Sequence, residues 1–236
     1  ITLLHLPTLL AVLWVLRREI RSLFTKQGRG LLLAVFLASV VTAGIGYPLD
    51  KVFDSRHGDL GFMGCALMTT GLILLLVEVV KPPPTAGGPW TWDRGLAVGF
   101  AQALAAIPGR SRLGMSTSAG MLCGRARAEA VVFSFLCSIP VTLGKTAKEC
   151  WKTVSAGEPD FWTNRVLYGA YPLAALIAFA AGVLTFRWLL GRLARRTLRP
   201  FGIYCLVLGL LALTWYISTP RMPPKPLSPD EQKAGI

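Results

Sequence analysis

Long apolar runs without charged residues alternate with short polar segments along most of the chain. The runs are Ile1–Leu16, Leu31–Leu49, Leu60–Val77, Gly95–Gly109, Ala130–Gly144, Val166–Phe186 and Pro200–Pro220. Several approach the roughly 20 residues that a helix needs to cross a hydrocarbon core about 30 Å thick. The pattern therefore predicts an all-α polytopic integral membrane protein with about six spanning helices.

Composition supports the same class of protein. Of the 236 residues, 53% are hydrophobic and 16% are charged, and the mean hydropathy is +0.53. These values lie outside the usual range for a soluble domain of this length. The five cysteines lie far apart with no CxxC or Cys/His spacing, so the sequence predicts neither a disulfide framework nor a metal-ligand set.

Basic residues outnumber acidic ones by 25 to 12, which gives a net charge of +13. They lie at the ends of apolar runs rather than along a solvated face, a distribution that is typical of membrane orientation and argues against nucleic-acid binding. The two main clusters are Arg17, Arg18, Arg21, Lys26 and Arg29, and Arg187, Arg192, Arg195, Arg196 and Arg199. Short cytoplasmic loops carry an excess of Lys and Arg, so we expect both clusters on the cytoplasmic side.

Counting spans from these two loops places Pro108–Thr117 and Lys145–Arg165 near the outer face. The stretch 108–145 then starts and ends on one face, and its first limb, Leu113–Gly124, measures only about 18 Å as a helix. We therefore favour a re-entrant helical hairpin over two full spans. Residues 1–218 are expected to form one membrane domain, and the proline-rich tail 219–236 is expected to be disordered.

The most distinctive polar segment lies between apolar limbs. Pro108 and Gly109 break the preceding helix, and glycines, hydroxyls and arginines follow. The candidate residues are Gly109, Arg110, Ser111, Arg112, Gly114, Ser116 and Thr117. A helix N-terminus with hydroxyls and a guanidinium group suits a phosphate. The alternative is that the arginines anchor at the headgroups while the serines cap a helix, but unpaired intramembrane charge is usually functional.

Other charged residues are expected to be structural. Glu78 precedes Lys81 by three residues and is expected to pair with it near the cytoplasmic end of a span. Arg125 and Arg127 are expected to be solvated turn residues. His57 would take part in chemistry only if its loop folded over the site.

Together, several segments resemble the undecaprenyl-diphosphatase (bacitracin-resistance) family, whose loop reads P-G-x-S-R-S-G-x-T. The matching segments are Pro108–Ser116, Gly120-Met121-Leu122, Phe133-Ser134-Phe135, Ile139-Pro140, Glu78-Val79-Val80-Lys81-Pro82, His5–Val12 and Pro200–Tyr204. The resemblance extends over residues 1–218. It implies an enzyme of the bacterial plasma membrane that removes one phosphate from undecaprenyl diphosphate, with its site towards the outer face.

The resemblance also implies roles for individual residues. Ser111 and Arg112 match the family's phosphate-contacting, catalytic Ser and Arg. Gly109 and Gly114 match the loop glycines, and Ser116 stands where the family has Thr. The implied cofactor is a divalent cation, Mg or Ca. The implied partners are a polyprenyl diphosphate lipid and the bilayer, while a homodimer stays open.

Three departures from the family bear on chemistry. Leu113 replaces a loop Ser, and Val132 replaces a Glu, with Glu129 one helical turn earlier. The family's E-G-x-x-E and S-S-x-G-H motif, which supplies carboxylates and a histidine, does not occur in this sequence. We expect that this motif precedes Ile1 in the full-length protein. The alternative is a catalytically incomplete protein that binds or translocates a lipid phosphate, and a third is a purely structural bundle.

Overall fold

The computed structural model describes residues 5–82, 88–155, 165–195 and 197–219, and no β-strand occurs among them. Apart from Thr219, the tail expected to be disordered lies outside the described residues. The helices are α1 (His5–Val15), α2 (Arg17–Leu23), η2 (Lys26–Gly28), α3 (Arg29–Val52), η3 (Asp54–Arg56), α4 (Leu60–Val80), α5 (Trp92–Leu104), α6 (Arg112–Leu122), α7 (Arg127–Ser155), α9 (Arg165–Arg195) and α10 (Arg199–Ser218).

Five of the described helices are long and apolar enough to cross a membrane. The candidate spans are Arg29–Val52, Leu60–Val80, Arg127–Lys148, Pro172–Leu193 and Arg199–Ser218. This confirms the predicted all-helical, polytopic fold class. The position of the short hairpin differs from the expectation for 108–145, because α5 has only 13 residues and α6 only 11, whereas α7 continues for 29. The short hairpin is therefore formed by α5 and α6, whereas Arg127–Lys148 of α7 is a candidate span.

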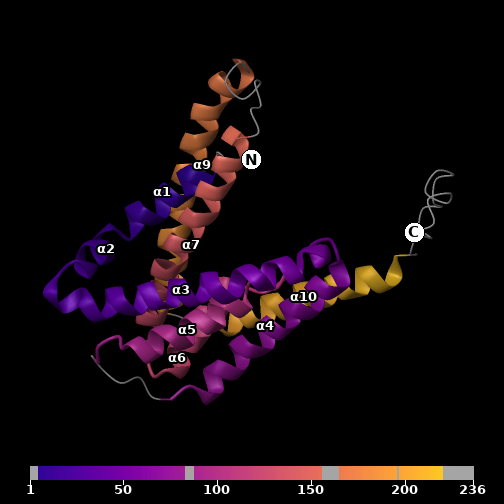
Figure 1. Cartoon of the computed structure of the whole chain (residues 1–236). Coiled ribbons are helices and arrows are strands. Elements are labelled where there is room, and N and C mark those ends of the chain that lie inside the picture. The colour runs from indigo at the N-terminus through magenta and orange to yellow at the C-terminus, as the bar shows by residue number, and fades with distance from the viewer. Residues whose placement is uncertain (1–4, 83–87, 156–164, 196, 220–236) are drawn as a thin grey trace.

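Figure 1 shows α3, α4, α5, α6 and α10 running alongside one another as one bundle, from which α7 and α9 rise with α1 beside them. The contacts agree with this arrangement, since α10 packs on α4, α5 packs on α3 and on α6, α6 packs on α7, and α1 packs on α9. The turn between α5 and α6 is thereby enclosed by neighbouring helices.

Small residues let α5 approach α3 closely. A Cβ added to Gly99 would lie 2.6 Å from the Cα of Ala38, so no side chain fits there. Thr42 on α3 donates a hydrogen bond to the carbonyl of Gly99 at 3.2 Å. Small residues at helix interfaces are a common means of association in membranes, where apolar burial gives little driving force. This contact fixes the depth of α5 along α3.

The largest fully buried side chain, Phe133 on α7, packs against α6 and the segment before α5. Its ring stacks on Trp90 with centroids 3.7 Å apart. Met121 on α6 and Leu136 on α7 are buried in the same cluster. Aromatic stacking and burial thus hold the start of α7 to α6 and to the segment before α5.

Candidate functional site

The predicted phosphate-binding segment forms the turn between α5 and α6. Gly109 has a φ of +87°. A Cβ there would lie 2.5 Å from the carbonyl oxygen of Met63 on α4, so both backbone conformation and space require glycine. Ser111 is the N-cap of α6, and its hydroxyl accepts a hydrogen bond from the backbone N–H of Gly114 at 3.2 Å. The serine cap that the structural alternative expected at the start of this helix is therefore present.

A cavity of about 600 Å³ lies between α3, the start of α6 and α7. Apolar side chains form much of its wall, among them Phe36 and Val40 on α3 and Val141 on α7. Arg112, the first residue of α6, also lines it. Arg112 forms no ion pair with any carboxylate in the described part of the chain. The arrangement is an apolar chamber with a charged guanidinium group at its wall.

Two hydroxyls connect the start of α6 to α7. Ser116 donates a hydrogen bond to the carbonyl of Arg112 at 2.6 Å. The Ser116 hydroxyl is also hydrogen-bonded to the hydroxyl of Ser134 on α7. Both serine side chains are buried. This pair fixes the position of the first turn of α6, and therefore of the Arg112 backbone, relative to α7.

The other predicted residues of the segment are not among those that line the cavity. Thr117 is 1% exposed, and its hydroxyl has no hydrogen-bond partner among the described residues. The Nε atom of Arg110 is likewise buried without a described partner. Gly114 faces Ser111, whose hydroxyl would lie 3.2 Å from an added Cβ. Of the seven predicted residues, Arg112 is the one that lines this cavity.

The far end of α6 carries a buried ion cluster. Glu78 on α4, whose side chain is 3% exposed, accepts two hydrogen bonds from Arg127 at 2.7 and 2.8 Å. Lys81 donates to it at 2.6 Å, and the backbone N–H of Leu198 donates at 2.6 Å. The predicted Glu78–Lys81 pair is confirmed. The prediction that Arg127 is a solvated turn residue is wrong, because this acceptor on α4 lies 49 positions away in the sequence.

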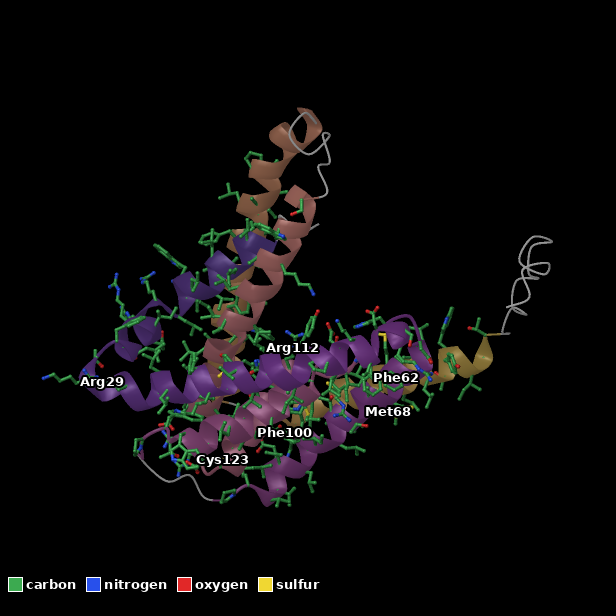
Figure 2. All side chains as sticks on the ribbon, viewed as in Figure 1. Arg29, Phe62, Met68, Phe100, Arg112 and Cys123 are labelled. Carbon is green, nitrogen blue, oxygen red and sulfur yellow. The ribbon has the colours of Figure 1, made fainter. Side chains whose placement is uncertain are left out.

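Arg125 is also buried, contrary to the prediction that it is a solvated turn residue. Its side chain is 4% exposed and forms an ion pair with Glu129 at 2.6 Å. The guanidinium group lies 5.2 Å from the ring centroid of Trp90 and donates a hydrogen bond to the carbonyl of Gly88. Stacking and pairing offset the cost of burying this charge. Figure 2 labels Arg112 and Cys123 near the two ends of α6.

Comparison with known proteins agrees with this architecture. Residues 1–211 match the family model described as bacitracin resistance protein BacA. The chain belongs to the BacA family. It is 32% identical to the undecaprenyl-diphosphatase of Chromohalobacter salexigens, over 89% of this chain and 82% of that protein. It is 36% identical to that of Anaeromyxobacter sp., over 91% and 73%, and 33% identical to that of Myxococcus xanthus, over 89% and 73%. As a BacA-family member with several spans, the chain is a multi-pass membrane protein.

Two segments that carry the BacA resemblance in sequence also meet in space. Ser134, in the Phe-Ser-Phe segment, contacts Ser116 in the loop segment. The positions that depart from the family are filled by apolar contacts, since Leu113 and Val132 both pack against the core. Glu129 is engaged by Arg125 and does not replace the absent Glu.

Sequence reasoning missed Lys148 and Tyr47, which line the same cavity as Arg112. Span counting placed Lys148, within Lys145–Arg165, on the same face as Pro108–Thr117. That shared face could have suggested that Lys148 lies near Arg112. Tyr47 stood within an apolar run, where an aromatic residue carries no signal of its own. Asp50 also lines the cavity, and its carboxylate lies 3.8 Å from the Nε2 of His57.

The described residues do not match the divalent cation that the resemblance implies. No group of three or more His, Cys, Asp or Glu side chains in that part of the chain is arranged to hold a metal ion. Asp50 is the acidic side chain at the cavity wall. A site that binds Mg²⁺ or Ca²⁺ through protein groups ordinarily supplies more than one carboxylate. A site with a single carboxylate needs further oxygen ligands, such as the phosphates of a substrate.

Proposed function

We propose that this chain hydrolyses undecaprenyl diphosphate to undecaprenyl phosphate and phosphate in the bacterial plasma membrane, which recycles the lipid carrier of cell-wall synthesis. In this reaction water adds to the terminal phosphorus, and the bridging oxygen leaves with the lipid monophosphate. Membership of the BacA family and the names of its relatives support this reaction.

The observation that carries the proposal is Arg112, which lines an apolar cavity and forms no ion pair with a carboxylate of the described residues. A prenyl chain needs an apolar surface, which Phe36 and Val40 provide along α3 where both are exposed. The diphosphate needs a cation in a site where water is scarce, because charge stabilisation is strongest there. The Ser116–Ser134 pair holds the backbone of Arg112 in place, so the position from which its side chain reaches the cavity is fixed before substrate binds.

Phosphate release by the full-length protein with Arg112→Ala tests the proposal. We expect the rate to fall by at least about 100-fold, the usual size of the loss when one charge-stabilising group is removed. Arg29→Ala, at the opposite end of α3, is the matched control and should keep wild-type release. Full turnover by Arg112→Ala would refute the role of Arg112. Binding of a prenyl diphosphate without turnover by the wild type would favour a lipid-phosphate binding protein instead.

The site is proposed to face the outer side of the membrane. The basic clusters that begin α3 and α10 lie at the Glu78 end, because Leu198 bonds Glu78 and Gly30 closely approaches the carbonyl of Trp90. The cavity extends towards the other end of α3. Labelling with a membrane-impermeant maleimide should reach Ser55→Cys in intact cells and should not reach Ser22→Cys.

Dependence on a divalent cation stays a prediction. We expect that a chelator lowers phosphate release by the full-length protein and that Mg²⁺ or Ca²⁺ restores it. Unchanged release in excess chelator would remove the cation from the proposal.

A further inference from the structure

Two lysines converge on one tyrosine at the cavity. The ammonium of Lys148 on α7 lies 4.7 Å from the ring centroid of Tyr47 on α3, and the ammonium of Lys51 lies 4.9 Å from the same centroid. Tyr47 is 49% exposed, and both lysines are exposed, so this group lies where the cavity reaches the surface. We call Tyr47, Lys51 and Lys148 the lysine rim.

The rim brings two positive charges to one side of the cavity opening. Neither Lys51 nor Lys148 forms an ion pair with a described carboxylate. Asp50 is the carboxylate at this part of the cavity wall, and it pairs with His57 at 3.8 Å. Two like charges at one ring repel each other, and a tyrosine quadrupole offsets only part of that repulsion. An anion between the ammonium groups would relieve it.

The rim belongs to the same chamber as Arg112 but is built from different elements. Tyr47 and Lys148 line the cavity from α3 and α7, while Arg112 lines it from the start of α6. An anion that enters along α3 towards Arg112 therefore passes Lys148 and the Tyr47 ring, on which Lys51 also lies. Lysine is suited to such a site, since its ammonium binds phosphate as a mobile point charge.

We propose that the lysine rim is a second phosphate-binding site, which holds a phosphate group at the opening of the cavity while Arg112 acts further in. This inference rests on the proposed function, because it assigns the rim to phosphate groups that enter or leave that reaction. The phosphate belongs either to the arriving lipid diphosphate or to the inorganic phosphate that is released. Tyr47 positions both ammonium groups.

Direct binding to the full-length, detergent-solubilised protein tests the rim without requiring turnover. The probes are farnesyl diphosphate and inorganic phosphate, titrated against wild type, a Lys51→Met/Lys148→Met double variant and Lys26→Met. Lys26 is an exposed lysine in η2 and controls for loss of charge alone. We expect the double variant to lose about tenfold or more in affinity for at least one probe, which corresponds to the loss of a charge-assisted contact, while Lys26→Met binds as wild type.

The two probes distinguish the source of the phosphate. Weaker farnesyl diphosphate binding, with a raised KM and nearly unchanged kcat, would identify the rim as a site for the lipid headgroup. Weaker inorganic phosphate binding, with loss of product inhibition at unchanged KM, would identify it as a site for the released product. Unchanged binding of both probes, or an equal loss in Lys26→Met, would overturn the inference.

Tyr47 provides a second, independent test. Tyr47→Phe keeps an aromatic face for the ammonium groups and should bind the affected probe within about threefold of wild type, whereas Tyr47→Leu should approach the double lysine variant. Equal behaviour of Phe and Leu at this position would refute positioning by the ring. Failure of the proposed function would appear separately, as absent phosphate release by the wild type, and would leave these binding results interpretable.

Discussion

Arginines lie at both ends of α6, since Arg112 begins the helix and Arg125 and Arg127 follow its end. The arginines at the two ends differ in whether a described carboxylate pairs with them. At the far end, Arg127 pairs with Glu78 and Arg125 pairs with Glu129. At the near end, Arg112 faces the cavity without a described carboxylate partner. A charge that only supports the fold is accompanied by its counter-charge, because burying it alone is costly. A charge intended for a ligand is left available for an anion that arrives later.

The largest effect is expected at the paired end. Glu78→Ala leaves Arg127, Lys81 and the N–H of Leu198 without their acceptor, so it should lower the free energy of unfolding by about 3–5 kcal/mol. Denaturant unfolding in detergent micelles measures this. Asp54→Ala, which removes an exposed carboxylate, is the control and should change stability little.

A double variant sharpens this prediction. Because Glu78 and Arg127 form one contact, Glu78→Ala combined with Arg127→Met should destabilise the protein by less than the sum of the two single changes. Strict additivity would mean that the cluster at this end does not act as a unit.

A smaller effect is expected where α7 supports the unpaired end. Ser134→Ala leaves the buried Ser116 hydroxyl with bonds only to backbone carbonyls of its own helix and should cost about 1 kcal/mol of stability. It should also lower kcat more than it raises KM, because the first turn of α6, which carries Arg112, is no longer bonded to α7. Ser138→Ala on α7 is the matched control for turnover. The Ser138 hydroxyl donates to the backbone carbonyl of Phe135 in the same helix. Equal kcat values for the two variants would contradict the positioning role.

The stability of α4, whose Met63 packs against Gly109 in the turn between α5 and α6, should depend weakly on pH. Asp59 is the N-cap of α4, and the backbone N–H of Phe62 bonds its carboxylate and lowers its pKa below the ordinary value of 3.8. A lowered folded-state pKa contributes stability that is fully present above the unfolded value and is lost as the pH falls through the folded value. Thermal unfolding should therefore show a small acid-side loss that Asp59→Asn reduces. An unchanged acid profile in Asp59→Asn would exclude this contribution.

The smallest stability change is expected for Arg112→Met. Since Arg112 has no described ion pair to lose, its replacement should change the free energy of unfolding by less than about 0.5 kcal/mol, although phosphate release is lost. A loss comparable with that of Glu78→Ala would mean that both ends of α6 are structural, which would remove the contrast between them.

The sequence predicted local features of the site well. The turn at Gly109, the serine cap that the structural alternative expected and the Glu78–Lys81 pair each depend on residues within a few positions of one another. Such features follow from backbone conformation and short-range hydrogen bonds. They could therefore be predicted before any packing was known. The helix before the turn ends at Leu104, four residues earlier than the predicted break at Pro108.

Features that depend on contacts between distant segments were not predictable. The apolar run at Gly95–Gly109 resembles a span, yet α5 ends at Leu104 because the chain turns there against α4 and α3. Arg127 pairs with Glu78, 49 positions away in the sequence. Lys148 on α7 contacts Tyr47 on α3, a residue far from it in the sequence. Charge counting gives the face on which a residue lies but not which helices pack together at that face.

The shortness of α6 has a consequence for the ionic environment of the site. Eleven residues of helix separate Arg112 from the Glu78 end by about 16 Å, roughly half the thickness of a hydrocarbon core. Mobile salt ions screen exposed charges over about 8 Å at physiological ionic strength, but they screen partly buried charges such as that of Arg112 much less. The attraction between Arg112 and a phosphate should therefore depend less on salt concentration than an attraction at the exposed Lys51 and Lys148.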